Sequence, residues 1–272
     1  MMNLTILVEN FCGKMDLLAE YGFSVHFKCT NGESILMDTG QGTTLFSNAE
    51  KLDINLKKIS NLVLSHGHFD HTWGVPDLLL KTGNIPVWAH PEFDKARYRK
   101  HQAEAFYIGS YIKKQDIDFR SIRNITEIVP EVWAVEVPMQ KRDKDYVPVT
   151  NHLMELENNI WKPDSFEDDI SLVVKGEHGY SIILGCAHAG VINILEEVSE
   201  LLNTKEFYAV VGGMHIGGQS KIFCENVVDK LVKDYKVKVW RPSHCTGFQA
   251  ASMLASRADN VEWGTVGTVL EL

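Results

Sequence analysis

The chain has 272 residues, of which 27 are Lys or Arg and 36 are Asp or Glu, so its formal charge at pH 7 is −9. Hydrophobic residues make up 44% and aromatic residues 10% of the sequence, a composition that excludes a globally disordered protein. The acidic balance argues against a general nucleic-acid-binding protein, which needs clustered positive charge.

The N-terminal segment and the cysteines indicate a cytoplasmic protein. No basic residue precedes the short apolar run at 4–8, so we expect a first strand there and not a signal peptide. No run approaches the roughly 18 apolar residues that a membrane span needs. The five cysteines are widely spaced and form no CxxC motif, which favours reduced thiols over a disulfide framework. The oligomeric state stays open.

The apolar pattern predicts alternating strands and helices. We predict strands at 4–8, 24–29 and 34–37, and the Asn31-Gly32 pair between the last two is a strong hairpin signal. A second hairpin is predicted at 171–184. Helices are predicted at 191–202 and 225–235, with strands following them at 207–211 and 237–240. This order predicts an α/β fold in which helices cover sheets.

The segment from Pro91 to Pro163 is richer in charged and aromatic residues than its surroundings. One interpretation is a solvated helical insertion with a small apolar face of its own. The other is a lid or cap over an active site that selects an anionic, ring-containing substrate, because insertions over a rigid scaffold often carry specificity. Both interpretations stay open.

A cluster of metal-ligand residue types follows the buried-strand pattern at 61–64 and reads HGHFDH over residues 66–71. Imidazole nitrogens and carboxylate oxygens are ligands of borderline divalent metals. On a turning loop His66 and His68 can share one ion, while Asp70 and His71 can face a second. We expect Gly67 to let the backbone come close to the metals. A random chain of this composition contains such a string with a probability on the order of 10⁻³.

Three more histidines, His188, His215 and His244, each follow an apolar strand pattern. Because ligands in α/β proteins gather at the strand ends that face the loops, we expect His188 and His244 to complete the metal site and His215 to lie beside it. The remaining histidines lack this context and are predicted not to be ligands: His26, His90, His101, His152 and His178.

The string at 66–71 resembles the signature of the metallo-β-lactamase superfamily, and the resemblance extends from Met37-Asp38-Thr39-Gly40 to His244. The strings GCAH at 185–188, GGMH at 212–215 and SHCTG at 243–247 are similar to one branch of it, the metal-dependent hydrolases of β-lactamase superfamily II. Members of that branch are often named 7,8-dihydropterin-6-yl-methyl-4-(β-D-ribofuranosyl)aminobenzene-5′-phosphate synthase.

The resemblance implies a single domain over residues 1–272, built as a four-layer αββα sandwich with a helical insertion at about 91–163 and with the metals at one edge of the sheets. The ligands it implies are His66, His68 and His188 for the first ion, and Asp70, His71 and His244 for the second. Asp38 would accept a hydrogen bond that fixes the tautomer of a ligand imidazole. The alternative for Asp38 is a turn aspartate before Thr39-Gly40.

The turn at Gly212-Gly213-Met214-His215 departs from many binuclear relatives, which carry an aspartate there that bridges both metals. An imidazole can bind one ion or a substrate oxygen but cannot bridge two ions, so we expect a weaker second site or a bridge of hydroxide alone. Relatives built for di-iron redox chemistry carry glutamate at the second signature position. His68 therefore favours hydrolytic zinc chemistry.

We predict a hydrolase with one or two Zn²⁺ ions, with Mn²⁺ or Fe²⁺ as alternatives, because such ions lower the pKa of bound water toward about 7. The predicted substrate is a small, anionic ester, phosphoester or lactone-like molecule. Asp70 would hold the nucleophile's proton, and His215 would assist catalysis. Thr246 and Gly247 are predicted to open a helix whose N–H groups suit an anionic oxygen of the substrate.

Two other functions stay open. One is a transferase that forms a bond to ribosyl phosphate, as the branch name implies, and the other is a metal-stabilised ligand-binding protein.

Ser65 and Cys245 adjoin predicted ligands, but we expect their side chains to point elsewhere, so no serine or cysteine nucleophile is predicted. We expect a small-molecule partner, and no nucleic acid or membrane.

Overall fold

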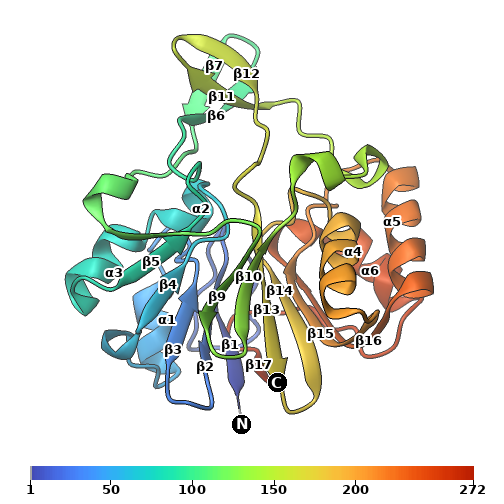
Figure 1. Cartoon of the computed structure of the whole chain (residues 1–272), viewed down its shortest axis with the longest axis horizontal. Helices are drawn as coiled ribbons and strands as arrows, with labels where there is room; N and C mark the ends of the chain where they lie inside the picture. Colours follow the sequence, from blue (N-terminus) through green and yellow to red (C-terminus); the bar gives the residue numbers. More distant parts are fainter. Residues whose placement is uncertain (1) are drawn as a thin grey trace.

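The computed structural model describes residues 2–272 as two β-sheets that lie face to face, with helices on their outer faces (Figure 1). The first sheet has the strand order β17-β1-β2-β3-β4-β5-β8, and the second has the order β16-β15-β14-β13-β10-β9. The strands of these sheets are β1 (Asn3–Val8), β2 (Ser24–Lys28), β3 (Ser34–Met37), β4 (Asn61–Val63), β5 (Pro86–Ala89), β8 (Asp118–Ser121), β9 (Ile125–Val129), β10 (Val132–Glu136), β13 (Ile170–Gly176), β14 (Gly179–Leu184), β15 (Glu206–Gly213), β16 (Lys236–Ser243) and β17 (Val269–Glu271).

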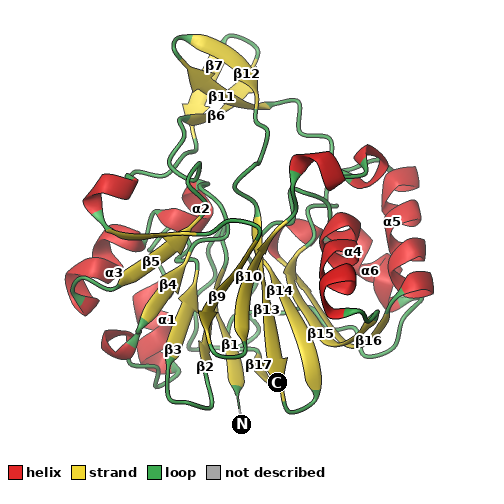
Figure 2. Ribbon diagram, viewed as in Figure 1, coloured by secondary structure: helices red, strands yellow, loops and turns green. Residues whose placement is uncertain are grey.

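The helices form the two outer layers (Figure 2). The α-helices are α1 (Leu45–Lys51), α2 (Phe69–Thr72), α3 (Val75–Thr82), α4 (Val191–Leu202), α5 (Lys221–Asp234) and α6 (Phe248–Ala255), and the 3₁₀ helices are η1 (Leu56–Lys58), η2 (Lys114–Asp116), η3 (Met139–Lys141), η4 (Lys144–Tyr146) and η5 (His244–Thr246). Helices α1 and α3 cover the first sheet, and α4, α5 and α6 cover the second (Figure 1). The predicted αββα sandwich is confirmed. Within residues 2–272 no helix is long and apolar enough to cross a membrane.

Strand β3 shows why both faces of the sheets are apolar. Successive side chains of a strand point to opposite faces. Ile35 and Met37 accordingly pack into the core between the two sheets, while Leu36 packs under the helices on the outer face. All three residues are fully buried. Each sheet is thus held by two apolar layers, which explains the near-continuous apolar runs in the sequence.

The local turn and cap signals agree with the structure. The Asn31-Gly32 turn joins β2 to β3 in an antiparallel pair, with Gly32 at a φ of +91° that glycine tolerates best. The helix predicted at 191–202 coincides with α4. Helix α5 begins at Lys221, four residues before the predicted start, because the Ser220 hydroxyl accepts a hydrogen bond from the Phe223 N–H and caps it.

The segment 91–163 is not the helical insertion that we predicted. It adds β8 to the first sheet and β9 and β10 to the second, and its helical residues are confined to η2, η3 and η4. Its remaining strands, β6 (Arg97–His101), β7 (Glu104–Tyr107), β11 (Leu153–Glu157) and β12 (Ile160–Pro163), form a separate sheet that projects beyond the sandwich (Figure 1). We call these four strands the cap sheet.

Cross-strand aromatic contacts explain why the cap sheet is extended. The Tyr98 ring packs edge-on against the rings of Tyr107 and Trp161, at centroid distances of 5.3 and 5.1 Å. Lys100 lies over the Trp161 ring at 4.7 Å. The pair of Tyr98 with Tyr107 belongs to the short hairpin of β6 and β7, whereas the contact with Trp161 forms only after distant segments have come together, so periodicity along one segment did not reveal it.

Candidate metal centre

The predicted ligands meet at one edge of the sandwich because their strands run parallel. Strand β3 pairs parallel with β4, and β15 lies parallel to both β14 and β16. Their carboxyl ends therefore face the same loops, as in other α/β proteins whose sites lie at strand ends. The residues that follow these ends are Asp38 after β3, His66 to His71 after β4, His188 after β14, His215 after β15 and His244 after β16.

His66, His68 and His188 form the first triad, with candidate ligand atoms that lie within 4.8 Å of one another. His66 Nε2 and His68 Nδ1 are 3.0 Å apart. Neither ring nitrogen of His188 has a hydrogen-bond partner among residues 2–272, although the side chain is buried. Burial, together with the neighbouring histidines, lowers the pKa of His66 and of His188 well below the ordinary value. Neutral imidazoles fit a metal ion, and the two unpartnered nitrogens of His188 leave it available as a ligand.

Asp70, His71 and His244 form the second triad, again within 4.8 Å. Asp70 Oδ2 lies 3.2 Å from His244 Nε2 and 3.9 Å from His71 Nε2. Burial alone would raise the pKa of Asp70, but the adjacent imidazoles of His71 and His244 outweigh it and hold that pKa below its usual range. The structure thus groups the six residues into the two sets that the resemblance implies, and their role as ligands stays a prediction.

Asp38 and Ser65 orient one imidazole of each triad. His71 Nδ1 donates to Asp38 Oδ2 at 2.6 Å, which turns His71 Nε2 toward Asp70. The Ser65 hydroxyl donates to the same carboxylate oxygen at 2.6 Å and lies 2.9 Å from His66 Nδ1. Burial opposes a charge on His71, yet Asp38 and Asp70 raise its pKa to about 9. Our expectation that the Ser65 side chain points elsewhere was wrong.

Two cysteines also face the centre, which the sequence analysis missed. Cys186 Sγ lies 3.2 Å from His71 Nε2 and forms a candidate ligand group with His66 and His71, so it sits between the two triads. Cys186, His215 and Cys245 form a further such group. Our expectation that Cys245 points away was therefore wrong. Both cysteines lie within two residues of a strand-end histidine, and that position was the available signal.

A buried ion-pair network joins the cap sheet to the loop that carries the first triad. Arg97 of β6 pairs with Asp164 at 3.0 Å and with Asp168 at 2.7 Å. Asp164 Oδ2 lies 3.6 Å from His68 Nε2, and Asp168 accepts the Gly67 N–H at 2.8 Å. Through these two carboxylates, Arg97 is linked to two residues of the loop, Gly67 and His68.

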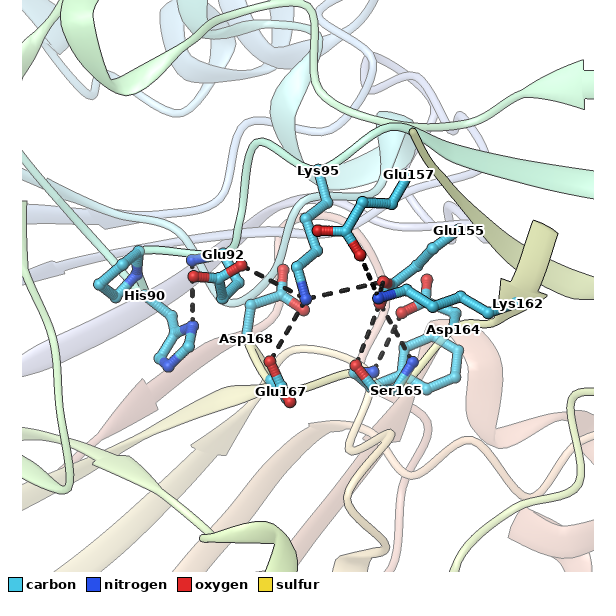
Figure 3. Close-up of polar contacts among 12 residues, drawn as sticks. His90, Glu92, Lys95, Glu155, Glu157, Lys162, Asp164, Ser165, Glu167 and Asp168 are labelled. Atoms are coloured by element: carbon cyan, nitrogen blue, oxygen red, sulfur yellow. Dashed lines mark hydrogen bonds and ion pairs between the residues drawn. The ribbon is translucent and has the colours of Figure 1, made fainter. Parts of the chain in front are cut away.

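Lys95 extends this network, with its ammonium group between Glu92, Glu155 and Glu167 (Figure 3).

The structural reason for a glycine at position 67 differs from the one we expected. A Cβ at Gly67 would overlap the carbonyl oxygen of Phe93, so glycine is required by a close approach of two chain segments rather than by the metals.

A cavity of about 440 Å³ opens over both triads, and its lining includes Asp70, His188 and His244. The segment 91–163 contributes Arg99 and His152 to the same cavity, and neither was singled out from the sequence. His152 was predicted not to be a ligand, and it belongs to none of the candidate metal groups among residues 2–272.

Within residues 2–272, the lining of this cavity does not include Thr246 or Gly247. The Thr246 hydroxyl accepts the Met214 N–H at 3.0 Å and is fully buried. Gly247 precedes α6, so the predicted helix is present. The substrate role of these two residues stays a prediction that this geometry does not favour.

Comparison with known proteins agrees with the fold and the centre. The family model described as metallo-beta-lactamase superfamily matches residues 22–192. The chain belongs to this superfamily. It is 29% identical over 263 residues to 7,8-dihydropterin-6-methyl-4-(beta-D-ribofuranosyl)-aminobenzene-5'-phosphate synthase of Methanocaldococcus jannaschii, covering 91% of this chain and 88% of the relative. It is 30% identical over 283 residues to an uncharacterized protein of the same organism, covering 98% and 99%.

Among solved structures, Tm1679, a metal-dependent hydrolase of the beta-lactamase superfamily, matches with a TM-score of 0.84 and 28% identity, covering 100% of this chain and 99% of that one. The superfamily resemblance is thereby confirmed. At this coarse level the chain is a metal-dependent hydrolase of the metallo-β-lactamase superfamily.

Proposed function

We propose that this superfamily member hydrolyses a small anionic ester, phosphoester or lactone-like substrate at one or two divalent ions held by the two triads. The observation that carries the proposal is that both triads open side by side into one cavity. Their imidazole and carboxylate donors suit Zn²⁺, and the Cys186 thiol between them adds a donor that Zn²⁺ also accepts. A cavity of about 440 Å³ favours a small-molecule partner.

Asp70 and His215 are the residues that we assign to proton transfer. A divalent ion in this centre supplies Lewis-acid activation of water and of the substrate's electrophilic group. Asp70 is ionised and belongs to the second triad, so it can accept a proton from a water molecule there. His215 lines the cavity with its ring 4.2 Å from that of His188. Burial opposes its protonation, but Cys245 and Asp169 raise its pKa, which suits it to donate a hydrogen bond to a substrate oxygen.

The test is hydrolysis by protein loaded separately with Zn²⁺, Mn²⁺ and Fe²⁺, against esters, phosphodiesters and lactones, with the bound metal quantified. We expect one to two metal equivalents and turnover that chelation abolishes. H68A should lose turnover while keeping the circular dichroism of the wild type. H101A, at an exposed residue of the cap sheet, is the matched control and should remain active. Undiminished turnover by metal-free protein would contradict the proposal, and no turnover of any class would favour a ligand-binding protein.

A second candidate is the synthase reaction, which the similarity to the synthase of M. jannaschii over 91% of this chain favours. In that case the cavity would hold a pterin precursor and a ribosyl phosphate compound, and the new bond between them would form as a leaving group departs from the pterin precursor and a proton from the other reactant. Product analysis by mass spectrometry separates the two proposals, because hydrolysis yields only the free acid and alcohol.

A further inference from the structure

Arg99 is an unpaired cation at the mouth of the cavity. Among residues 2–272 no carboxylate lies within ion-pair distance of its guanidinium, and its side chain makes no hydrogen bond. Every other arginine of the chain has at least one such partner: Arg97, Arg120, Arg123, Arg142, Arg241 and Arg257. In a chain with a formal charge of −9 and many carboxylates, an arginine without a partner is an exception.

The register of the cap sheet places Arg99 in the wall of the cavity that also contains the candidate metal ligands. Strand β6 pairs with β11 so that Arg97 lies opposite Glu155 and Arg99 opposite Leu153. Residues directly opposite in an antiparallel pair, and residues two apart on a strand, share a face. On this shared face, Arg97 forms the buried ion pairs described above. Arg99 and Leu153, on the same face, line the cavity.

Two uncharged hydrogen-bonding side chains, His152 and Tyr21, line the same cavity as Arg99. Burial lowers the pKa of His152, and the Arg99 charge lowers it further, so this imidazole is neutral. The Tyr21 phenol carries its proton at neutral pH and can donate a hydrogen bond. Both residues line the cavity with Arg99. The mouth thus combines one positive charge with two neutral donors, while the candidate metal ligands lie deeper.

We propose that Arg99 binds an oxyanion group, a carboxylate or a phosphate, of a substrate whose reacting group lies at the two triads. The planar guanidinium can donate two parallel hydrogen bonds to such a group, and His152 can donate a third. The inference rests on the proposed hydrolase function and narrows its substrate class to small molecules with a hydrolysable bond and a second, anionic end.

Hydroxamates with anionic tails test this assignment, because the hydroxamate group binds divalent metals while its tail extends away from them. The probes are the monohydroxamates of succinic, glutaric and adipic acid, their analogues with a terminal phosphonate, and alkyl hydroxamates of equal length. The length series varies the separation between the metal-binding group and the anionic end. Dissociation constants for the Zn²⁺-loaded protein are measured by calorimetry, so the readout does not depend on turnover.

At the best length we expect the anionic tail to improve binding about tenfold over the alkyl tail, as for a charge-assisted hydrogen bond at a partly exposed site. R99Q should lose this advantage, and R99K should keep part of it because lysine retains the charge without the planar fork. K100Q, on the opposite face of the same strand, is the control and should keep it fully. A stronger effect of phosphonate or of carboxylate identifies which oxyanion is preferred.

Two results would overturn the inference. If hydroxamates bind but no tail length favours the anion, or if R99Q keeps the advantage, Arg99 does not bind the substrate, while the hydrolase proposal stands. If no hydroxamate binds to protein that carries Zn²⁺, the bound ion does not face the cavity, and the hydrolase proposal and this inference fail together.

Discussion

The metal centre and the cap sheet face the same cavity, but they are held in different ways. At the centre the candidate ligands are buried, and other side chains hold their rings: Asp38 holds His71, and Asn10 Oδ1 lies 2.9 Å from His244 Nδ1. In strands β7 and β12 of the cap sheet exposed side chains predominate, and ring contacts such as that of Tyr98 with Trp161 hold the strands. The centre is thus fixed from several sides, while these two outer strands of the cap sheet make fewer buried contacts.

Backbone conformation shows the same contrast. In the cap sheet the left-handed residues Asn158 and Asn159, at φ of +50° and +63°, form the turn between β11 and β12, where such angles are expected. At the centre Asp38, His215 and His244 have φ of +60°, +49° and +50° directly after strands. Left-handed backbone at residues other than glycine costs of order 1–3 kcal/mol each, so packing must hold these side chains in place. We infer that mutations at the centre alter metal binding, while those in the cap sheet alter substrate choice.

The largest effect is expected at His188. H188A removes one of three donors from the first triad, so the protein should lose about one metal equivalent, and turnover should fall by a factor on the order of 10³. Elemental analysis and steady-state kinetics measure the two changes. H178A, at an exposed histidine between β13 and β14, should change neither. Wild-type metal content in H188A would contradict the assignment of His188 as a ligand of the first ion.

The next largest effect is expected at Arg97, whose buried ion pairs connect the cap sheet to the loop of the first triad. R97Q leaves Asp164 and Asp168 without their buried cation, and we expect the free energy of unfolding to fall by about 3 kcal/mol. Urea denaturation measures it. R120Q removes the exposed pair with Asp118 and should cost less than about 1 kcal/mol. Equal losses of unfolding free energy in the two variants would show that the Arg97 ion pairs stabilise the protein no more than a surface pair does.

Asp38 is expected to act through His71 rather than directly. D38N keeps the shape of the side chain but loses the charge that favours the Nδ1-protonated ring, so metal affinity should drop about 10- to 100-fold. Competition with a chromophoric chelator reports this affinity. D53N, at an exposed aspartate that follows α1, serves as the comparison. An unchanged affinity in D38N would leave Asp38 with only its turn role.

Per pH unit, the smallest expected effect is the pH dependence that His90 contributes. Burial and the Arg123 guanidinium lower the pKa of His90 to about 3, and His90 Nε2 lies 2.7 Å from Arg123. Between pH 6 and pH 4 the unfolded chain binds a proton at this position that the folded chain does not, so stability falls as the pH is lowered. The slope is about 1.4 kcal/mol per pH unit for one such group. Urea titrations should show a shallower slope in H90Q than in the wild type, and identical slopes would contradict this assignment.

The sequence by itself determined the features that depend on near neighbours. The Asn31-Gly32 hairpin, helix α4 and the ligand string at 66–71 could be predicted, because turn type, helical period and ligand spacing are local properties. The grouping of His188 and His244 with that string followed from the resemblance, and the parallel strands explain it. The sequence was therefore sufficient to predict the sandwich and the spatial grouping of the six residues, while their role as ligands stays a prediction.

The tertiary structure alone decided which neighbours of the ligands face inward. Ser65 and Cys186 adjoin or nearly adjoin histidines, and sequence position cannot tell whether a side chain on an irregular loop points to the metals or away. The cap sheet and Arg99 depend on the pairing of β6 with β11, which lie more than fifty residues apart. Such pairings are stabilised only when distant segments meet, so the side chain expected to select the substrate could not be identified before the fold was known.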